Sequence, residues 1–127
     1  MKKKILVVDD EKNITVFLKA FLEDTGNYEV ETENSGRGGY EAAIRFQPDL
    51  ILLDVMMGDM SGDGVAGLIK SDPTLRKTPI VFLTGIVTKQ EVQDSGGVMG
   101  GYPYIAKPIL TMRELIDCIE AHAKKSV

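Results

Sequence analysis

Five short apolar runs, separated by segments of helical periodicity, constrain the fold of this chain more than any other feature. The runs are residues 5–8, 28–32, 50–53, 80–84 and 102–106. Runs 5–8 and 50–53 are uninterrupted, which is typical of strands buried on both faces of a parallel sheet. Run 28–32 alternates apolar and polar residues, which predicts an edge or half-exposed strand. Strands that alternate with helices predict a doubly wound α/β fold with a five-stranded parallel sheet.

Apolar residues at helical spacing predict the intervening helices. A stripe from Ile14 to Leu22 predicts a first helix, which Gly26 ends. Further helices are expected over residues 39–46, 62–71 and 88–99 and after Thr111. The segment 88–99 is a poor helix former, because each interior glycine costs about 1 kcal/mol relative to alanine.

Two local signals refine the last part of the chain. Thr111 and Glu114 have the spacing of a capping box, which predicts the start of the final helix. Pro103 lacks a backbone N–H, which predicts an edge position for the strand at 102–106.

Composition limits the classes of function. The length of 127 residues predicts one domain over 1–127. The net charge of −4 argues against a nucleic-acid-binding surface, which needs clustered Lys and Arg. Cys118 is the single cysteine, so no intrachain disulfide forms, and this fits a cytoplasmic location. No stretch approaches the ~20 apolar residues of a membrane span.

Polar residues stand where the predicted strands end. Asp9 and Asp10 follow the first strand, Asp54 the third, Thr84 ends the fourth and Lys107 follows the fifth. Taken singly, each has an ordinary explanation: a helix cap or turn for the aspartates, a β-former for the threonine, a solvated loop for the lysine. The ends of parallel strands meet at one edge of a sheet, however, and ligand sites form there. We therefore expect these five side chains to converge.

Converging carboxylates require a cation. Two like charges about 4 Å apart repel by about 4 kcal/mol at an effective dielectric constant of 20. Lys107 supplies one positive charge. Oxygen ligands alone suit Mg²⁺, and no histidine or further cysteine is placed to favour zinc. The sequence therefore predicts a magnesium site.

The stretches "ILVVDDE", "PDLILLDVMM", "PIVFLTG" and "YIAKP", in this order, resemble the bacterial two-component response-regulator receiver domain. The resemblance, which is chemotaxis-Y-like, covers essentially the whole chain. It implies a flavodoxin-like fold with strand order 2-1-3-4-5. It also implies a signalling switch that takes a phosphoryl group from a sensor histidine kinase or a histidine phosphotransfer protein.

The resemblance also implies roles for the site residues. Asp54 would be the phosphoacceptor. Asp10, Asp54 and the backbone carbonyl of Met56 would bind Mg²⁺ directly, and Asp9 would act through water. An aspartate carboxylate can attack phosphorus as a covalent nucleophile.

The conformational response would involve three residues. Thr84 would hydrogen-bond to the phosphoryl group, Lys107 would pair with it, and Tyr104 would change rotamer as Thr84 moves. The output surface would be the fourth helix, the fifth strand and the fifth helix. The resemblance also allows a dimer that forms on phosphorylation.

The sequence departs from the family pattern at several positions. Gly58 stands where proline is frequent, Gly85 where alanine is common and Ile109 where phenylalanine is frequent. Met56 and Ile86, which flank the acceptor in the family, are both apolar here. Neither can orient a water molecule by hydrogen bonding, so slow loss of the phosphoryl group is expected.

Two other classes share part of this pattern. A haloacid-dehalogenase-type phosphohydrolase also forms an aspartyl phosphate, but its nucleophile lies after the first strand in a D-x-D pattern, where this chain has "DDE". A flavin-binding flavodoxin needs a hydroxyl- and glycine-rich phosphate loop at that place, whereas this chain has "DDEKN", which cannot bind a phosphate in this way. The expected protein is thus a switch rather than an enzyme, with the phosphohydrolase as the alternative. His122 is interpreted as a favourable charge at a helix end rather than as a phosphorelay histidine.

Overall fold

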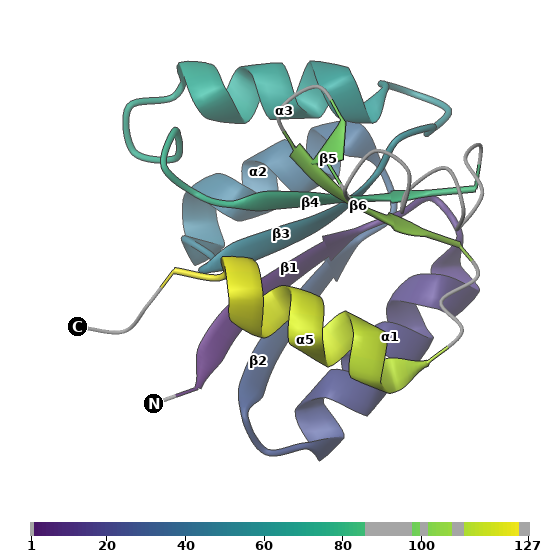
Figure 1. Ribbon diagram of the computed structural model, residues 1–127. Helices are drawn as coiled ribbons and strands as arrows, with labels where there is room; N and C mark the ends of the chain where they lie inside the picture. Colours follow the sequence, from purple (N-terminus) through teal and green to yellow (C-terminus); the bar gives the residue numbers. More distant parts are fainter. Residues whose placement is uncertain (1, 86–97, 100–101, 108–110, 125–127) are drawn as a thin grey trace.

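The computed structural model describes residues 2–85, 98–99, 102–107 and 111–124, and its strands form one twisted sheet (Figure 1). The strands are β1 (Lys3–Val8), β2 (Tyr28–Glu33), β3 (Leu50–Asp54), β4 (Ile80–Thr84), β5 (Val98–Met99) and β6 (Tyr102–Ala106). Their order in the sheet is β2-β1-β3-β4-β6-β5. The neighbours β2-β1-β3-β4-β6 are parallel, which confirms the predicted order 2-1-3-4-5 with β6 as the fifth parallel strand.

Helices cover both faces of this sheet (Figure 1). The helices within the described residues are α1 (Lys12–Asp24), α2 (Gly36–Phe46), α3 (Gly62–Ser71) and α5 (Met112–His122). One face carries α1 and α5, and the opposite face carries α2 and α3. The doubly wound prediction is therefore confirmed.

The central strands divide their side chains between two hydrophobic clusters. Along β1, Ile5 and Val7 pack on the side of α1 and α5, while Leu6 and Val8 pack on the side of α2 and α3. All four are fully buried. A strand buried on both faces needs apolar residues at every position, which explains why the runs in the sequence are continuous.

The local signals in the sequence mark real boundaries. The Thr111 hydroxyl accepts a hydrogen bond from the Glu114 N–H at 3.1 Å at the start of α5. β2 lies at the edge of the sheet, as its alternating pattern predicts. At the end of α2, Gln47 adopts a left-handed conformation with φ of 52°, which the sequence does not signal.

Two predictions near the last strand differ from the structure. Most of the helix expected over 88–99, residues 88–97, lies outside the described residues, but its last two residues, Val98–Met99, form strand β5, antiparallel to β6. Only two glycines separate β5 from β6 in the sequence, a spacing that favours a hairpin. Pro103 consequently does not lie at the outer edge, because β6 has β4 on one side and β5 on the other. The β4 pairing begins one residue later, at Tyr104, so it does not require the missing N–H of Pro103.

Candidate functional site

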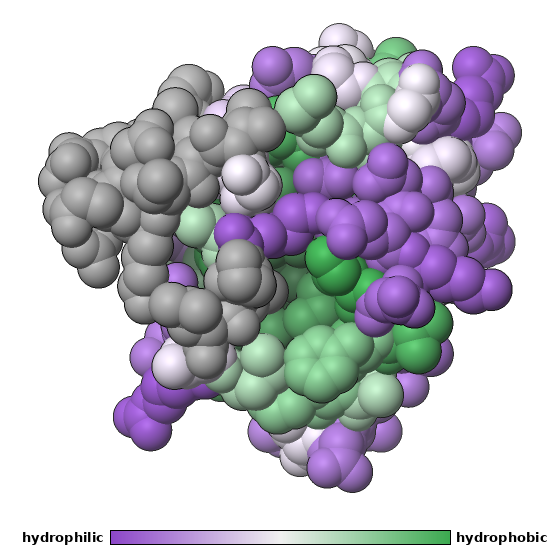
Figure 2. All heavy atoms as spheres, turned by 90° about the vertical axis from the view of Figure 1, so that its right-hand side faces the viewer, coloured by the Kyte–Doolittle hydropathy of each residue, from purple (hydrophilic) through white to green (hydrophobic). Residues whose placement is uncertain are grey.

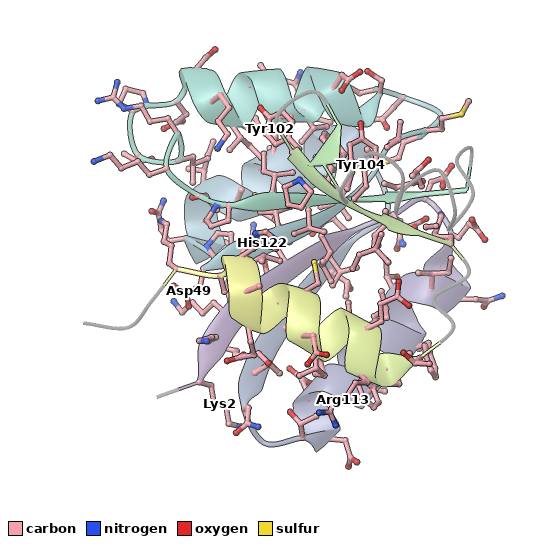
Figure 3. The ribbon with its side chains drawn as sticks, viewed as in Figure 1. Lys2, Asp49, Tyr102, Tyr104, Arg113 and His122 are labelled. Carbon is pink, nitrogen blue, oxygen red and sulfur yellow. The ribbon has the colours of Figure 1, made fainter. Side chains whose placement is uncertain are left out.

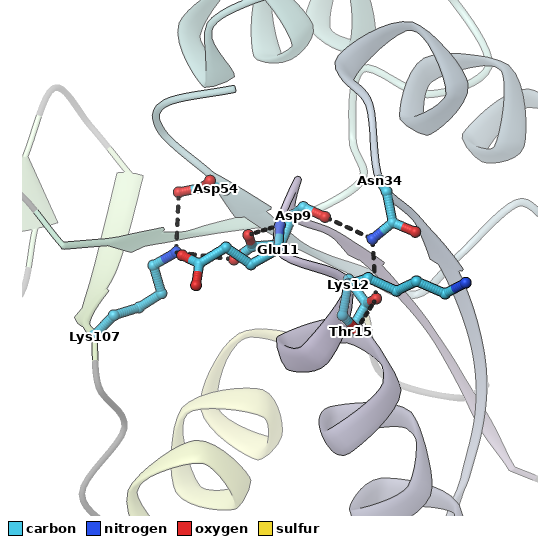
Figure 4. Close-up of polar contacts among 7 residues, drawn as sticks. All are labelled: Asp9, Glu11, Lys12, Thr15, Asn34, Asp54 and Lys107. Atoms are coloured by element: carbon cyan, nitrogen blue, oxygen red, sulfur yellow. Dashed lines mark hydrogen bonds and ion pairs between the residues drawn. The ribbon is translucent and has the colours of Figure 1, made fainter. Parts of the chain in front are cut away.

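The structure brings the polar residues at the strand ends together at one edge of the sheet (Figure 4). Asp9 follows β1, Asp54 ends β3, Thr84 ends β4 and Lys107 follows β6. Asp9, Asp54 and Thr84 are 0%, 4% and 1% exposed. Charged groups are rarely buried unless they are paired or bind a metal, so this edge is a candidate functional site.

Three aspartates supply a set of oxygen ligands. One carboxylate oxygen from each of Asp9, Asp10 and Asp54 lies within 4.8 Å of the others. Burial, and after it the charge of Asp9, raise the pKa of Asp54 to about 6, although Lys107 opposes both effects. A divalent cation among these oxygens would offset the repulsion, and Mg²⁺ suits an all-oxygen set. The residues present therefore fit a magnesium ion.

Lys107 is the cation that the structure contains at this edge. Its Nζ lies 3.0 Å from Asp9 Oδ2, 3.2 Å from Glu11 Oε1 and 3.4 Å from Asp54 Oδ1. Its side chain is only 12% exposed, so it is not a solvated loop lysine. Burial acts to lower the pKa of Lys107, but the surrounding carboxylates outweigh burial and raise it. The backbone N–H of Lys107 also donates a hydrogen bond to the Thr84 carbonyl at 2.8 Å, which fixes the lysine beside β4.

The turn between β1 and α1 is held by contacts that the sequence did not predict. Asp9 Oδ1 accepts a hydrogen bond from the Glu11 N–H at 2.9 Å. Asn34, which follows β2, donates from its side chain to the Asp9 carbonyl at 2.8 Å and to Thr15 Oγ1 at 3.0 Å (Figure 4). Glu11 is the N-cap residue of α1 and makes no side-chain cap bond, so neither aspartate caps this helix. These contacts join side chains of different elements, and no local pattern in the sequence signals them.

The other predicted site residues surround this cluster. Met56 follows Asp54 in the loop before α3 and is 62% exposed, and its backbone N–H acts to lower the pKa of the Asp54 carboxyl. Tyr104 is partly buried on β6, on the side of α2 and α3, and its ring centroid lies 5.2 Å from that of Phe82 (Figure 3). His122 is the exposed last residue of α5 and does not join the site (Figure 3).

The departures from the family pattern have different structural settings. A Cβ atom on Gly58 or Gly85 would meet no heavy atom within 4 Å. The space beside Gly85 is therefore open. Ile86 and Ile109 lie outside the described residues.

The face that carries the strand ends combines a polar band with an apolar area. Figure 2 shows hydrophilic residues across the middle of this face and hydrophobic residues below them. On α1, Val16 and Phe17 are 57% and 55% exposed.

Comparison with known proteins identifies the family. A family model described as the response regulator receiver domain matches residues 5–120. The chain belongs to the response regulator receiver domain family. It is a receiver domain, and the known role of such domains is that of a phosphoacceptor switch in two-component signalling.

Curated relatives and solved structures agree with this assignment. The receiver domain is 36% identical over 124 residues to the response regulator ArlR of Staphylococcus saprophyticus, covering 96% of this chain and 53% of that protein. It is 38% identical over 109 residues to the response regulator PleD of Caulobacter vibrioides, covering 86% of this chain and 24% of that protein. The chain thus spans about half the length of the first of these relatives and about a quarter of the second.

Two solved structures show the same fold. The chemotaxis protein CheY4 of Vibrio cholerae has a TM-score of 0.80 at 29% identity, covering 95% of this chain and 98% of that chain. The N-terminal domain of a response regulator receiver protein from Methanoculleus marisnigri has a TM-score of 0.69 at 37% identity, covering 94% of each chain. Within the described part of the receiver domain, no helix combines the length and apolar character needed to cross a membrane.

Proposed function

We propose that Asp54 is the residue of this receiver domain that accepts the phosphoryl group. The supporting observation is its setting: a carboxylate that is 4% exposed, at the end of β3, beside two further aspartates and 3.4 Å from Lys107. A carboxylate nucleophile needs a neighbouring positive charge to bring it close to an anionic phosphoryl group, and Lys107 provides that charge. In this proposal the receiver domain occupies residues 1–127.

The donor is a phosphohistidine on a sensor kinase or a histidine phosphotransfer protein. A carboxylate oxygen of Asp54 forms a bond to phosphorus while the bond between phosphorus and the imidazole nitrogen breaks. The imidazole leaves with the bonding electron pair and takes up a proton from solvent. The product is an acyl phosphate on Asp54, and Lys107 balances part of its charge.

Mg²⁺ is the cofactor in this proposal. Asp10, Asp54 and the backbone carbonyl of Met56 would hold the ion directly, with Asp9 acting through water. When bound, the ion neutralises charge on the phosphoryl oxygens and on the carboxylates. The chain's own contribution is to present these oxygens at one place, on a turn fixed by Asn34.

The signal passes from the acceptor to a surface. Thr84 hydrogen-bonds to the phosphoryl group and moves toward it, and Tyr104 turns into the space that Thr84 leaves. This changes the surface of the fourth helix, the fifth parallel strand and α5. Added phosphoryl charge can bias such a two-state element. The partly buried position of Tyr104, against Phe82, supports this role.

The remaining assignments follow from this function. The receiver domain works in the cytoplasm, contacts neither nucleic acid nor membrane directly, and promotes only its own phosphorylation and dephosphorylation. The proposal leaves its output partner unknown and allows a dimer that forms on phosphorylation.

The test is incubation with acetyl phosphate and Mg²⁺, followed by intact mass measurement. We expect one phosphoryl group on the wild type, none on Asp54→Ala and none in EDTA. Asp24→Ala, at an exposed position of α1, is the matched control and should be phosphorylated like the wild type. A phosphoryl group on Asp54→Ala would contradict the assignment. Continuous release of phosphate from small esters would instead favour a phosphohydrolase.

A further inference from the structure

Asp59, in the loop that follows the acceptor, binds the start of α2. Its Oδ1 accepts a hydrogen bond from the Gly36 N–H at 2.9 Å, and its Oδ2 accepts one from the Arg37 N–H at 3.1 Å. Gly36 and Arg37 are the first two residues of α2. Both oxygens of one exposed carboxylate therefore connect the loop between β3 and α3 to a different helix.

The first turn of α2 depends on this carboxylate. Three of its first four residues are glycines, which are poor helix formers, and it has no acidic residue of its own. Ser35 takes two N–H groups, that of Gly38 with its hydroxyl and that of Gly39 with its carbonyl. Asp59 takes the N–H groups of Gly36 and Arg37, which have no carbonyl partner within the helix. The negative charge of Asp59 is also favourable at the positive end of the helix dipole, whereas the positive charge of Arg37 is unfavourable there.

The same part of the loop packs directly on α2. A Cβ atom on Gly36 would lie 2.9 Å from Met60 Cβ and 3.0 Å from Val65 Cγ2, closer than real side chains come. The second half of the loop, Asp59 and Met60, is therefore fixed to α2 by both hydrogen bonds and close packing.

The first half of the loop contacts the acceptor. The backbone N–H of Met56 lies near the Asp54 carboxylate and acts to lower the pKa of that carboxyl. Gly58 separates the two halves; it has no side chain, and the space around it is open. Glycine restrains the backbone less than any other residue. Asp59 follows Gly58 immediately, so its hydrogen bonds hold the loop at the first position after its least restrained residue.

We propose that Asp59 is a positioning residue of the phosphoacceptor site. By binding the first turn of α2, it holds the loop so that the Met56 backbone stays against Asp54. The consequence for Mg²⁺ affinity rests on the proposed function, whereas the restraint on Met56 does not. Asp59 itself touches neither Asp54 nor the metal ligands in this proposal; it acts through the loop.

The experiment compares Asp59→Ala and Asp59→Asn with the wild type. Asp63→Ala is the matched control, because Asp63 is also exposed, carries the same charge and lies in the first turn of α3. Hydrogen exchange of the Met56 amide is measured by NMR in EDTA, and the Mg²⁺ dissociation constant is measured by calorimetry. Both are measured under conditions in which every variant is fully folded by circular dichroism.

We expect faster exchange at Met56 in Asp59→Ala and a dissociation constant for Mg²⁺ raised about tenfold, the low end of the loss when a group that orients a metal ligand is removed. Asp59→Asn, whose amide oxygen can still accept one hydrogen bond, should fall between Asp59→Ala and the wild type. Asp63→Ala should leave the exchange unchanged.

Two results would overturn the inference. One is unchanged exchange at Met56 in Asp59→Ala. The other is an equal loss of Mg²⁺ affinity in Asp59→Ala and Asp63→Ala, which would mean that only the lost charge matters. If no variant, wild type included, is phosphorylated on Asp54, the proposed function fails, and Met56 exchange still decides the role of Asp59.

Discussion

Lys107 lies closer to Asp9 than to Asp54, although it contacts both. The distances from Nζ are 3.0 Å to Asp9 Oδ2 and 3.4 Å to Asp54 Oδ1. The lysine thus leaves Asp54 incompletely compensated, in agreement with the raised pKa of that carboxyl, about 6. In the absence of a metal, the ionised form of Asp54 is disfavoured.

Asp54→Asn should stabilise the folded protein at neutral pH when no divalent metal is present. The folded-state pKa of Asp54, about 6, lies above the ordinary value of 3.8. Between these values the folded chain keeps a proton that the unfolded chain has lost, so stability falls as pH rises through this window. The variant avoids this loss. The difference in free energy of unfolding between Asp54→Asn and the wild type should therefore increase by about 1–3 kcal/mol from pH 4 to pH 7. Urea unfolding in EDTA measures it. Asp24→Asn is the control, and an advantage of Asp54→Asn that does not change with pH would contradict the cause given.

Lys107→Met should destabilise the protein at neutral pH in EDTA. The variant leaves Asp9 and Asp54 buried without their common counter-charge, which costs about 3 kcal/mol. Added Mg²⁺ should restore part of the lost stability, because it supplies positive charge to the same carboxylates. Lys12→Met, exposed at the start of α1, should change the free energy of unfolding by less than about 0.5 kcal/mol. Equal losses in the two variants would show that the ion pairs of Lys107 contribute nothing.

Replacing two glycines of α3 by alanine should change the stability of the protein in opposite directions. A Cβ atom on Gly62 would lie 2.5 Å from the Asp54 carbonyl oxygen and 2.9 Å from Val55 Cα, and neither backbone atom can move away easily. Gly62→Ala should cost about 1–3 kcal/mol and reduce phosphorylation of Asp54 by displacing the base of the loop. At Gly67 a Cβ atom would meet nothing within 4 Å, so Gly67→Ala should stabilise by about 0.5–1 kcal/mol. Chemical denaturation of both variants tests the pair, and a stabilised Gly62→Ala would show that the loop is not closely packed.

Met56→Asn should shorten the lifetime of the phosphorylated protein by several-fold. Met56 is exposed beside the acceptor and cannot orient a water molecule, whereas an asparagine amide can. The measurement is loss of the phosphoryl group after the phosphodonor is removed, followed by intact mass. Met56→Leu, which also lacks a polar group, is the control. Equal lifetimes of Met56→Asn and the wild type would count against the expected slow loss.

The convergence of polar residues at one edge of the sheet could be predicted from the sequence because its signals are local. Asp9, Asp54 and Thr84 adjoin apolar runs, and parallel strands place their ends at one edge. The position of Lys107 at this edge could be predicted for the same reason. Its contacts with three carboxylates could not be predicted from the sequence.

The parts that could not be predicted depend on contacts between distant elements. Asp59 has no local signal, because its partners precede it by 22 and 23 positions. Asn34 likewise acts on a turn that belongs to another strand. Strand β5 was missed because its two residues carry no periodicity, so the two glycines that follow it had no recognisable strand before them to indicate a hairpin.

The separation of the site residues along the chain has a consequence for folding during synthesis. Lys107 follows Asp9 by 98 positions, and β6 comes last in sequence among the described strands. On a ribosome, β1 and β3 can pair and bring three aspartates together before their lysine has been made. For that interval the nascent chain has the carboxylates without their own counter-charge. If these aspartates hold Mg²⁺ as proposed, free Mg²⁺ in the surrounding solution would offset their repulsion during that interval.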